Sequence, residues 1–408
     1  MDAVILALVE QHVREVVMLR EMRTRLVRSP QVRIAQLAAL DERIAAHLDG
    51  IVVAGPHGKA MCGEALAPPD TGSLFAAGVL MIEERDAEGL RRLFALAASL
   101  PAARRGLVSS FGWVSASRLR GITKALLDAA EPMYREFGLA ACAMHRIDPG
   151  AALAESSANG RVAWRAAVAL GRIDLAPALV DRLRTAGPDL AFDAARAALL
   201  LGEHDPALSA LQELGTVLGT AAEPALELLV SAAPIAQARA VLKRMYDDPQ
   251  RWPTLVRLIG LSGDPHFVPW LIARMDQPAL ARLAGESFCL IAGVDLVAGK
   301  LDRPAPQDLP EDADDAPSDI EQAELAWPDP AKVAAWWHEH GTRFTPGVRH
   351  LVGAPLSTTQ GHAVLRNGSQ PQRSLAAIHL CLLAPGTPLF NTAAPAWRQR
   401  RWLAALGT

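Results

Sequence analysis

Two histidines and a glutamate in one short segment have the side-chain types of a metal site. His338, Glu339 and His340 follow one another near the end of a predicted helix. A zinc-protease site needs the spacing HExxH, because both histidines must share one helical face. Histidines two residues apart point about 200° apart around a helix. We therefore interpret this segment as a solvated helix end, and we predict no metal and no cofactor.

The segment IVVAGPHGKAM (51–61) has the composition of a phosphate-binding loop. It does not have the spacing GxxxxGK[S/T], since Lys59 is followed by Ala60. We predict a plain loop between helices. No GxSxG occurs, and the paired acids Glu83-Glu84 and Asp247-Asp248 are placed like solvated helix ends. The sequence therefore predicts no catalytic residue and a protein that is not an enzyme.

A repeated pattern from about Asn159 to Leu296 is the stretch around which the rest of the chain is organised. In each copy a helix rich in Ala and Leu ends near a Gly, and the next helix opens with Asp-Pro or a variant. The equivalent positions have spacings of 31, 28, 31 and 31 residues and are Asp174, Asp205, Ala233, Asp264 and Asp295. A near-constant period of this size is typical of stacked helix pairs. We predict an all-α solenoid of stacked helical hairpins with a small C-terminal helical unit.

Each repeat carries its own start and stop signals. An Asp at a helix start accepts hydrogen bonds from amides that have no partner within the helix. Pro fits the first helical position, where its missing N–H costs nothing, and Gly ends the preceding helix. These local rules explain why the pattern predicts pairs of short helices.

The composition limits the classes of function. The formal net charge is −3 and the pI is about 6.4, so a general affinity for nucleic acid is not expected. The start of the chain lacks the pattern of a signal peptide, and no apolar run of about 18 residues would span a membrane. The cysteines are far apart, without a CxxC pair, which predicts reduced thiols and a cytoplasmic protein; they are Cys62, Cys142, Cys289 and Cys381.

The chain divides into four parts in this prediction. Residues 1–69 form an N-terminal helical cap with helices at 2–28 and 34–48, and Asp49-Gly50 is expected to end the second of them. Residues 70–300 form the repeat array. The array begins with less regular helices at 73–84, 87–100, 116–128 and 132–145. Residues 301–326 form an acidic, Pro-rich linker, and 327–408 form the C-terminal unit and its tail. The first helix of that unit is expected to start at Asp329-Pro330 and to end at Gly341.

Two charged segments near the end have open interpretations. Eight acids and no Lys or Arg stand between Asp308 and Glu324, which favours a solvated linker over an acidic docking segment. The tail APAWRQRRWL (394–403) alternates Trp with Arg. It could contact RNA or an acidic partner. The alternative is a tail that folds back onto the acidic linker.

Arginines and tryptophans in the array are the candidate partner-binding residues. Arg165 and Arg196 each stand nine residues before an Asp anchor, which predicts a short basic ladder across neighbouring repeats. Trp and Arg often dominate interface energetics. In the alternative, the Trp side chains fill seams and the Arg side chains are solvated. The complete candidate set is Arg161, Trp164, Arg165, Arg196, Trp252, Arg257, Trp397, Arg400, Arg401 and Trp402.

The repeats resemble HEAT repeats, and longer segments sharpen that resemblance. LDERIAAHLDGIVVAG (40–55), RLAGESFCLIAGVDL (282–296), AWWHEHGTRFTPGVRHLVGAP (335–355) and QRRWL (399–403) look like an uncharacterised bacterial HEAT-repeat family. Genes of that family accompany type VI secretion clusters. The resemblance extends over nearly the whole chain and implies a HEAT-like α-solenoid, but its motifs are structural. No catalytic residue is carried over from it.

The resemblance implies a non-enzymatic accessory of type VI secretion in the cytoplasm. An adaptor or chaperone of this kind would bind a protein partner, such as a secreted effector or a spike component, without nucleic acid and without membrane insertion. An immunity protein that neutralises a secreted toxin is the alternative. A lyase or hydroxylase built on HEAT repeats is a further one, and it would need acids or histidines gathered on the concave face. The sequence does not predict the oligomeric state.

Overall fold

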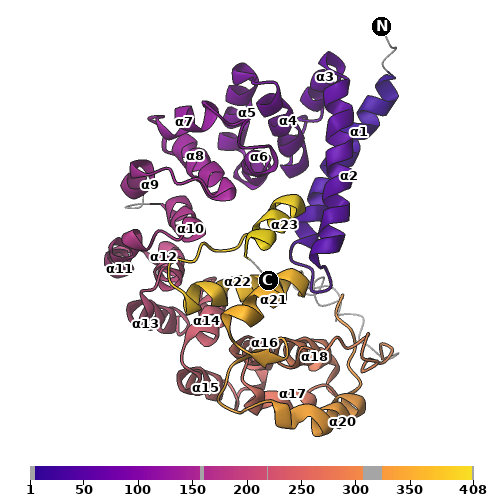
Figure 1. The fold of residues 1–408 in the computed structure, drawn as a ribbon, viewed down its shortest axis with the longest axis vertical. Coiled ribbons are helices and arrows are strands. Elements are labelled where there is room, and N and C mark those ends of the chain that lie inside the picture. The colour runs from indigo at the N-terminus through magenta and orange to yellow at the C-terminus, as the bar shows by residue number, and fades with distance from the viewer. Residues whose placement is uncertain (1–4, 157–159, 218, 307–323, 407–408) are drawn as a thin grey trace. The chain divides into compact units, whose positions relative to one another are not determined.

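The computed structural model describes residues 5–156, 160–217, 219–306 and 324–406, and helices make up most of them (Figure 1). The strands among these residues are β1 (His350–Leu351) and β2 (Ala354–Pro355), which pair antiparallel. The prediction of an all-α fold of stacked helical hairpins is confirmed. None of the described helices is long and apolar enough to cross a bilayer.

Contacts divide the chain into two compact units. The first comprises Met1–Arg28, Val32–Leu170 and Asn391–Thr408, and the second comprises Ser29–Gln31 and Gly171–Phe390. The chain therefore passes from the first unit into the second and returns to the first for its last helix.

The first unit is built of packed helices. They are α1 (Leu6–Leu26), α2 (Ile34–Val53), α3 (Pro56–Glu64), α4 (Thr71–Glu83), α5 (Ala87–Ser99), α6 (Pro101–Trp113), α7 (Ile122–Leu127), α8 (Pro132–His145), α9 (Ala151–Ser156), α10 (Arg161–Leu170) and α23 (Ala396–Ala405).

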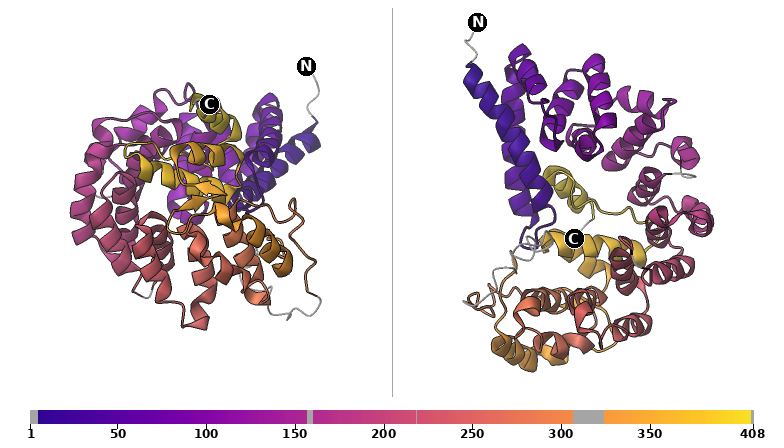
Figure 2. Two further views of the ribbon diagram at one scale, coloured as in Figure 1. Left: turned by 60° about the horizontal axis from the view of Figure 1, so that its bottom comes forward. Right: turned by 180° about the vertical axis from the view of Figure 1, so that it is seen from behind.

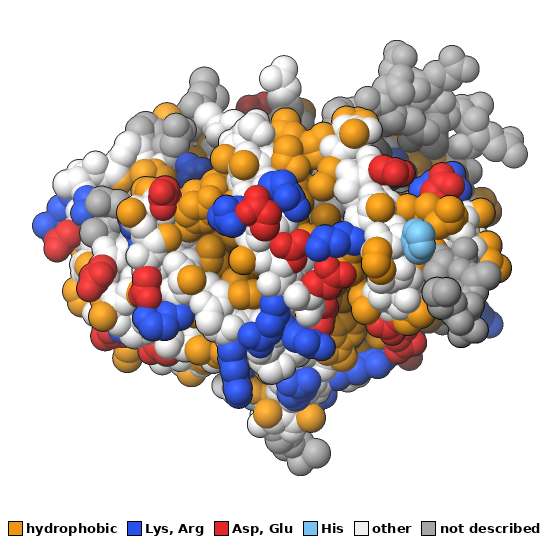
Figure 3. All heavy atoms as spheres, turned by 90° about the horizontal axis from the view of Figure 1, so that it is seen from above, with side chains coloured by type: hydrophobic (Ala, Val, Ile, Leu, Met, Phe, Trp, Pro, Cys, Tyr) orange, Lys and Arg blue, Asp and Glu red, His pale blue; other side chains and the backbone are white. Residues whose placement is uncertain are grey.

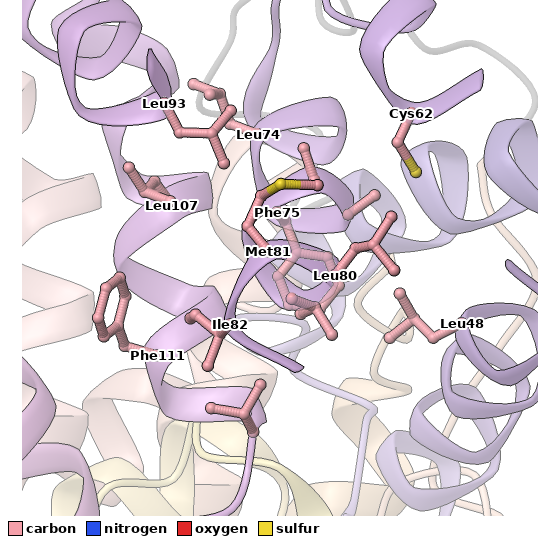
Figure 4. Packing of buried hydrophobic residues seen from close by; sticks show 14 of the residues in the cluster. Leu48, Cys62, Leu74, Phe75, Leu80, Met81, Ile82, Leu93, Leu107 and Phe111 are labelled. Carbon is pink, nitrogen blue, oxygen red and sulfur yellow. The ribbon is translucent and has the colours of Figure 1, made fainter. Parts of the chain in front are cut away.

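Helix α4 is the centre of the core of the first unit. Its residues from Gly72 to Ile82 are all buried, because the segment is apolar around its whole circumference. Helix α1 packs on it from one side, and α5 and α6 pack on it as well. Figure 4 shows Phe75 and Leu80 of α4 among side chains of the neighbouring helices, such as Leu107.

A buried ion pair holds the C-terminal segment in this unit. Arg23 Nε lies 2.5 Å from Asp41 Oδ1, and both side chains are buried. Arg23 also donates to the carbonyls of Ala393 and Ala394, and the Ala396 amide donates to Asp41 Oδ2 at 2.7 Å. Both members of the pair thus have further hydrogen-bond partners, as a buried pair requires. Helix α23 follows directly and packs on α2.

Two predictions near the N-terminus were wrong. Asp49-Gly50 does not end a helix, because α2 continues to Val53. Gly50 is instead a point of close approach, since a Cβ there would lie 2.7 Å from the His12 ring on α1. Residues 51–61 are largely helical rather than a loop. The break is confined to Ala54 and Gly55, after which Pro56 opens α3.

The second unit contains the regular repeats and most of the predicted C-terminal unit. Its helices are η1 (Ile173–Leu175), α11 (Ala176–Thr185), α12 (Pro188–Leu200), α13 (His204–Leu214), α14 (Ala222–Ala232), α15 (Ile235–Lys243), η2 (Pro249–Arg251), α16 (Trp252–Ser262), η3 (Pro265–Phe267), α17 (Val268–Ile272), α18 (Pro278–Ala292), α20 (Pro330–His340), η5 (Gly341–Arg343), α21 (Thr358–Asn367) and α22 (Gln370–Leu383).

The predicted repeat anchors all lie at or just after the junction that follows the first helix of a pair. Asp205 is in the first turn of α13, Ala233 caps the end of α14, and Asp264 caps the start of η3. Asp174 lies in η1, and Asp295 accepts hydrogen bonds from the two amides of Val297 and Ala298. Helix α14 packs on α16, which packs on α18. The period read from the sequence is therefore the period of the hairpins.

Asp264 also joins two repeats. Its carboxylate is 1% exposed and accepts from Arg239 at 2.6 and 3.1 Å and from the His266 amide. Burial raises the pKa of this carboxyl, but the Arg239 guanidinium and the amide outweigh burial and hold the pKa below its ordinary value.

Two stretches near the end of the chain, 345–353 and 385–388, run across the repeat turns; we call them the C-terminal strap. The carbonyls of Ala233, Gly263 and Leu290 lie at the C-terminal ends of α14, α16 and α18 and accept hydrogen bonds from the strap. Pro385 and Gly386 lie against the turns at Gly202 and Gly171. The orphan carbonyls at helix ends are satisfied in this way. Figure 2 shows these orange and yellow segments against the repeat helices.

The predicted C-terminal unit is shared between the two compact units. Helices α20, α21 and α22 belong to the second, where α22 packs on α12 and α14, whereas α23 belongs to the first. The helix start at Asp329-Pro330 and the end near Gly341 lie where they were predicted. Most of the predicted acidic linker lies outside the described residues.

Candidate functional site

The candidates on α10 divide between surface and core. Arg161 and Arg165 are exposed, whereas Trp164 is 2% exposed and packs in the core of the first unit. Trp164 thus has the position expected if tryptophans fill seams between helices. Arg196 is half-buried on α12 and belongs to the second unit, while Arg165 belongs to the first.

The tail candidates lie on α23. Trp397 is half-buried and meets Trp113 edge to face, with ring centroids 4.6 Å apart. The Arg146 guanidinium lies 4.2 Å from the ring centroid of Trp402. Arg400 and Arg401 are exposed. Both tail indoles therefore make contacts within the first unit, whereas Arg400 and Arg401 meet solvent.

Arg257 on α16 is already paired. Its Nη1 lies 2.6 Å from Glu223 Oε1 and 3.7 Å from Glu227 Oε1 on α14. Burial raises the pKa of Glu227, and Arg257 opposes that rise. The charge of Arg257 is thus neutralised within the stack.

Trp252, at the start of α16, belongs to a cluster that the sequence did not predict as a whole. We call it the aromatic–arginine cluster: Tyr246, Trp252, Trp270 and Arg274. Local structure explains each position. The Asp248 side chain accepts from the Gln250 amide and caps η2, which leads into Trp252. Trp270 lies on α17, and Arg274 lies in the turn that directly follows this helix.

The rings of the cluster are fixed by their contacts. Trp252 Nε1 donates to the Tyr246 carbonyl at 3.1 Å. The Trp252 and Trp270 rings are nearly perpendicular, at 88°, with centroids 6.1 Å apart, and the Tyr246 ring lies 5.2 Å from Trp270. Edge-to-face pairs of this kind are favourable beyond the apolar area that they bury. All four side chains are only half-buried, so the cluster presents a rigid aromatic surface to solvent.

Arg274 occupies the corner between the two indoles. Its Cζ lies 4.3 Å from the Trp252 centroid and 4.8 Å from the Trp270 centroid. Contacts of a guanidinium with aromatic faces contribute roughly 0.5–2 kcal/mol. Burial raises the pKa of the Tyr246 phenol, and the Arg274 charge opposes that rise. The cation is therefore held in place by rings rather than by a carboxylate.

The sequence signal for this cluster was incomplete. Trp252 is among the binding residues that the sequence predicts, whereas Tyr246, Trp270 and Arg274 are not. The spacing of Trp270 and Arg274, four residues apart, would have placed both on one helical face. Nothing local in the sequence brings Trp252 to that face, because the contact depends on how α16 and α17 pack.

Residues that could suggest chemistry make other contacts. A hollow of about 160 Å³ in the first unit is lined in part by Cys142 and His145. Burial raises the pKa of the Cys142 thiol to about 11, so it is protonated near neutral pH. Burial lowers the pKa of His145, whose Nε2 lies 2.8 Å from the Phe111 carbonyl. This arrangement supplies no thiolate nucleophile.

The segment with the two histidines is a helix end. His340 stacks on Trp336 with centroids 4.5 Å apart, and its Nδ1 lies 2.9 Å from the Trp336 carbonyl. His338 is exposed on the same helix, α20. In the described ranges, no three or more His, Cys, Asp and Glu side chains gather as a metal site.

Charge is mixed on the surface as well. Figure 3 shows one face, on which acidic and basic side chains lie beside one another and neither sign covers the face.

Comparison of the chain with protein-family models, with curated proteins and with solved structures finds no match.

Proposed function

We propose that this chain is a non-enzymatic, protein-binding solenoid that serves type VI secretion as a cytoplasmic adaptor or chaperone. Its partner in this proposal is a secreted effector or a spike component. The association with secretion comes from the resemblance of segments such as 282–296 and 335–355 to a HEAT-repeat family. The binding role has separate support from the surface of the second unit.

The aromatic–arginine cluster is the observation that carries the binding role. Trp, Tyr and Arg are the residue types most enriched where alanine substitution weakens protein interfaces. Here Trp252, Trp270 and Arg274 are half-buried and held rigid by mutual contacts. A rigid surface loses little side-chain entropy on binding, which favours affinity. Stacked repeats supply the extended support for such a surface.

The first experiment identifies the partner. Tagged protein is purified from the native host, and the proteins that accompany it are identified by mass spectrometry. The capture is repeated with the double variant Trp252→Ala and Trp270→Ala. We expect the double variant to lose the partner by tenfold or more, since each ring supplies apolar area at the centre of the surface.

Two control variants accompany that capture. Trp337→Ala removes another half-buried indole of the second unit, which packs on Phe344 with ring centroids 5.1 Å apart. Charge reversal of Arg165 and Arg196 together tests the basic ladder predicted from the sequence. All variants are compared below their melting temperatures. Equal capture by the wild type and the Trp252/Trp270 variant would remove the cluster as the binding surface.

A second experiment separates an adaptor from an immunity protein. Deleting the gene of an adaptor stops export of its cargo and leaves the producing cells viable. Deleting the gene of an immunity protein leaves the cells sensitive to toxin from their kin. We expect loss of export without self-poisoning. Killing of the deletion strain by its parent would overturn the adaptor role and leave the binding surface intact.

A further inference from the structure

Arg274 lacks the acidic partner that two other arginines of the same unit have. Arg257 is paired with Glu223, and Arg239 is paired with the buried Asp264. No carboxylate of the described residues lies within the 4.0 Å of an ion pair with Arg274, although Asp276 stands two residues away. Its Nε is buried without a hydrogen-bond partner. The charge is thus held in position and left uncompensated.

The geometry around Arg274 suits a planar anion. The two perpendicular indoles fix the guanidinium plane, and the side chain as a whole is only half-buried. A guanidinium presents parallel N–H donors that match the two oxygens of a carboxylate. Partial burial lowers the local dielectric, which strengthens such a bond relative to one made in open water.

A second unpaired guanidinium lies beside the same segment. Arg303 donates from Nη2 to the carbonyl of Met275, the residue after Arg274, at 3.1 Å. Its Nε is also buried without a partner, and no ion pair with a described carboxylate is formed. Two guanidinium groups, of Arg274 and Arg303, therefore lie near residues 274–275, although the net charge of the whole chain is negative.

We infer that Arg274 is the receptor for a carboxylate side chain of the protein partner, and that the bound segment is acidic with apolar residues beside the acid. The apolar residues would pack on the half-buried faces of Trp252 and Trp270. This inference rests on the proposed function, because it assigns the chemistry of the segment that the same surface binds. The bound carboxylate supplies the counter-charge that Arg274 lacks.

The test uses the full-length protein and a defined probe. A fluorescein-labelled peptide of Glu and Leu is titrated, and its counterpart with Gln in place of every Glu serves as the neutral probe. The wild type is expected to bind the Glu peptide at least tenfold more tightly than the Gln peptide. Arg274→Gln is expected to abolish that difference, and Arg274→Lys to restore only part of it because it lacks the planar fork.

Arg184→Gln is the matched control. Arg184 is an exposed arginine near the end of α11 in the same unit, and its change removes the same charge. We expect it to leave the preference for Glu unchanged. Selective ¹⁵N labelling of Trp adds a second readout, since a peptide bound at the cluster shifts the indole signals of Trp252 and Trp270.

The outcomes distinguish this inference from the proposed function. Equal binding of the Glu and Gln peptides, with shifts of the two indole signals, overturns the carboxylate receptor and keeps the protein-binding surface. A preference for Glu that survives in Arg274→Gln also overturns the receptor. If neither peptide shifts the indoles and the captured partner is insensitive to Trp252→Ala and Trp270→Ala, the inference and the binding role of this cluster both fail.

Discussion

The main-chain amide of His350 donates a hydrogen bond of 2.7 Å to the carbonyl oxygen of Gly263. Gly263 ends α16 with a φ of +65°, and a Cβ at this position would lie 2.4 Å from the carbonyl oxygen of His350. The same glycine therefore meets two needs. It adopts the left-handed conformation that ends the helix, and it lets the C-terminal strap approach the turn.

Gly263→Ala is expected to destabilise the second unit by about 3 kcal/mol, because it adds a clash to the cost of a positive φ. Gly347→Ala is the matched control. Gly347 has a φ of +85°, but a Cβ added there would have no atom within 4 Å, so the change should cost only about 1 kcal/mol. Chemical denaturation measures both. Equal losses would mean that the close approach of the strap contributes nothing.

The pair Arg23–Asp41 gives a second prediction, for the first unit. Asp41→Asn leaves a buried guanidinium without its counter-charge and weakens the contact with the Ala396 amide. We expect a loss of roughly 3–5 kcal/mol. Hydrogen exchange should show lower protection in residues 391–406, because the C-terminal segment is bonded to the pair.

The control for this pair is Arg14→Ala on α1. Arg14 forms an exposed ion pair with Glu10 at 3.3 Å, and its loss should cost less than about 1 kcal/mol. Replacing the buried pair by Arg23→Met with Asp41→Leu should recover part of the lost stability, since no unpaired charge then remains. Unchanged exchange in Asp41→Asn would contradict the role of the pair in holding the C-terminal segment.

Glu286 on α18 gives a pH prediction. Burial, together with the nearby charge of Asp295, raises the pKa of the Glu286 carboxyl from 4.5 to about 7. The folded state thus holds this proton over a range in which the unfolded state has lost it. The resulting stability is fully present below the unfolded pKa and is lost as pH rises through the folded pKa.

In the wild type, the free energy of unfolding should fall by about 1–3 kcal/mol as the pH rises from 4.5 to about 7. Glu286→Gln should not show this fall, because its amide does not titrate. Above pH 7 the variant should be more stable than the wild type. Glu339→Gln changes an exposed glutamate on α20 and should leave the pH profile as it is. Thermal unfolding across this pH range measures the difference, and parallel profiles for wild type and Glu286→Gln would contradict the raised pKa.

Local rules predicted the hairpins well and long-range contacts poorly. Asp205 and Asp264 are recognisable because a cap depends on residues a few positions away, and the period repeats the signal. Gly50 was misread because a helix-ending glycine and a glycine at a helix crossing look alike in sequence. The strap was missed for a similar reason. No local pattern in residues 345–353 predicts that their amides donate hydrogen bonds to the carbonyls of Gly263 and Leu290.

The sequence predicts only Trp252 of the aromatic–arginine cluster, because the cluster too depends on long-range contacts. Trp252 carried a signal of residue type, and Trp164 carried the same signal although it lies in the core. Burial depends on which helix packs above a side chain, which residue type does not specify. The contacts of Arg274 with both indoles form only when α16 packs beside α17. Trp252 and Trp270 are eighteen positions apart in the sequence.

The C-terminal strap has a consequence for the order in which the second unit is completed. During synthesis the repeat helices from α11 to α18 leave the ribosome before residues 345–353 and 385–388 exist. Until then the carbonyls of Ala233, Gly263 and Leu290 lack the donors that the strap supplies. Arrival of the strap joins turns that are far apart along the chain, a set of contacts with large sequence separation. The part of the second unit that is synthesised last is therefore the part that links its separate turns.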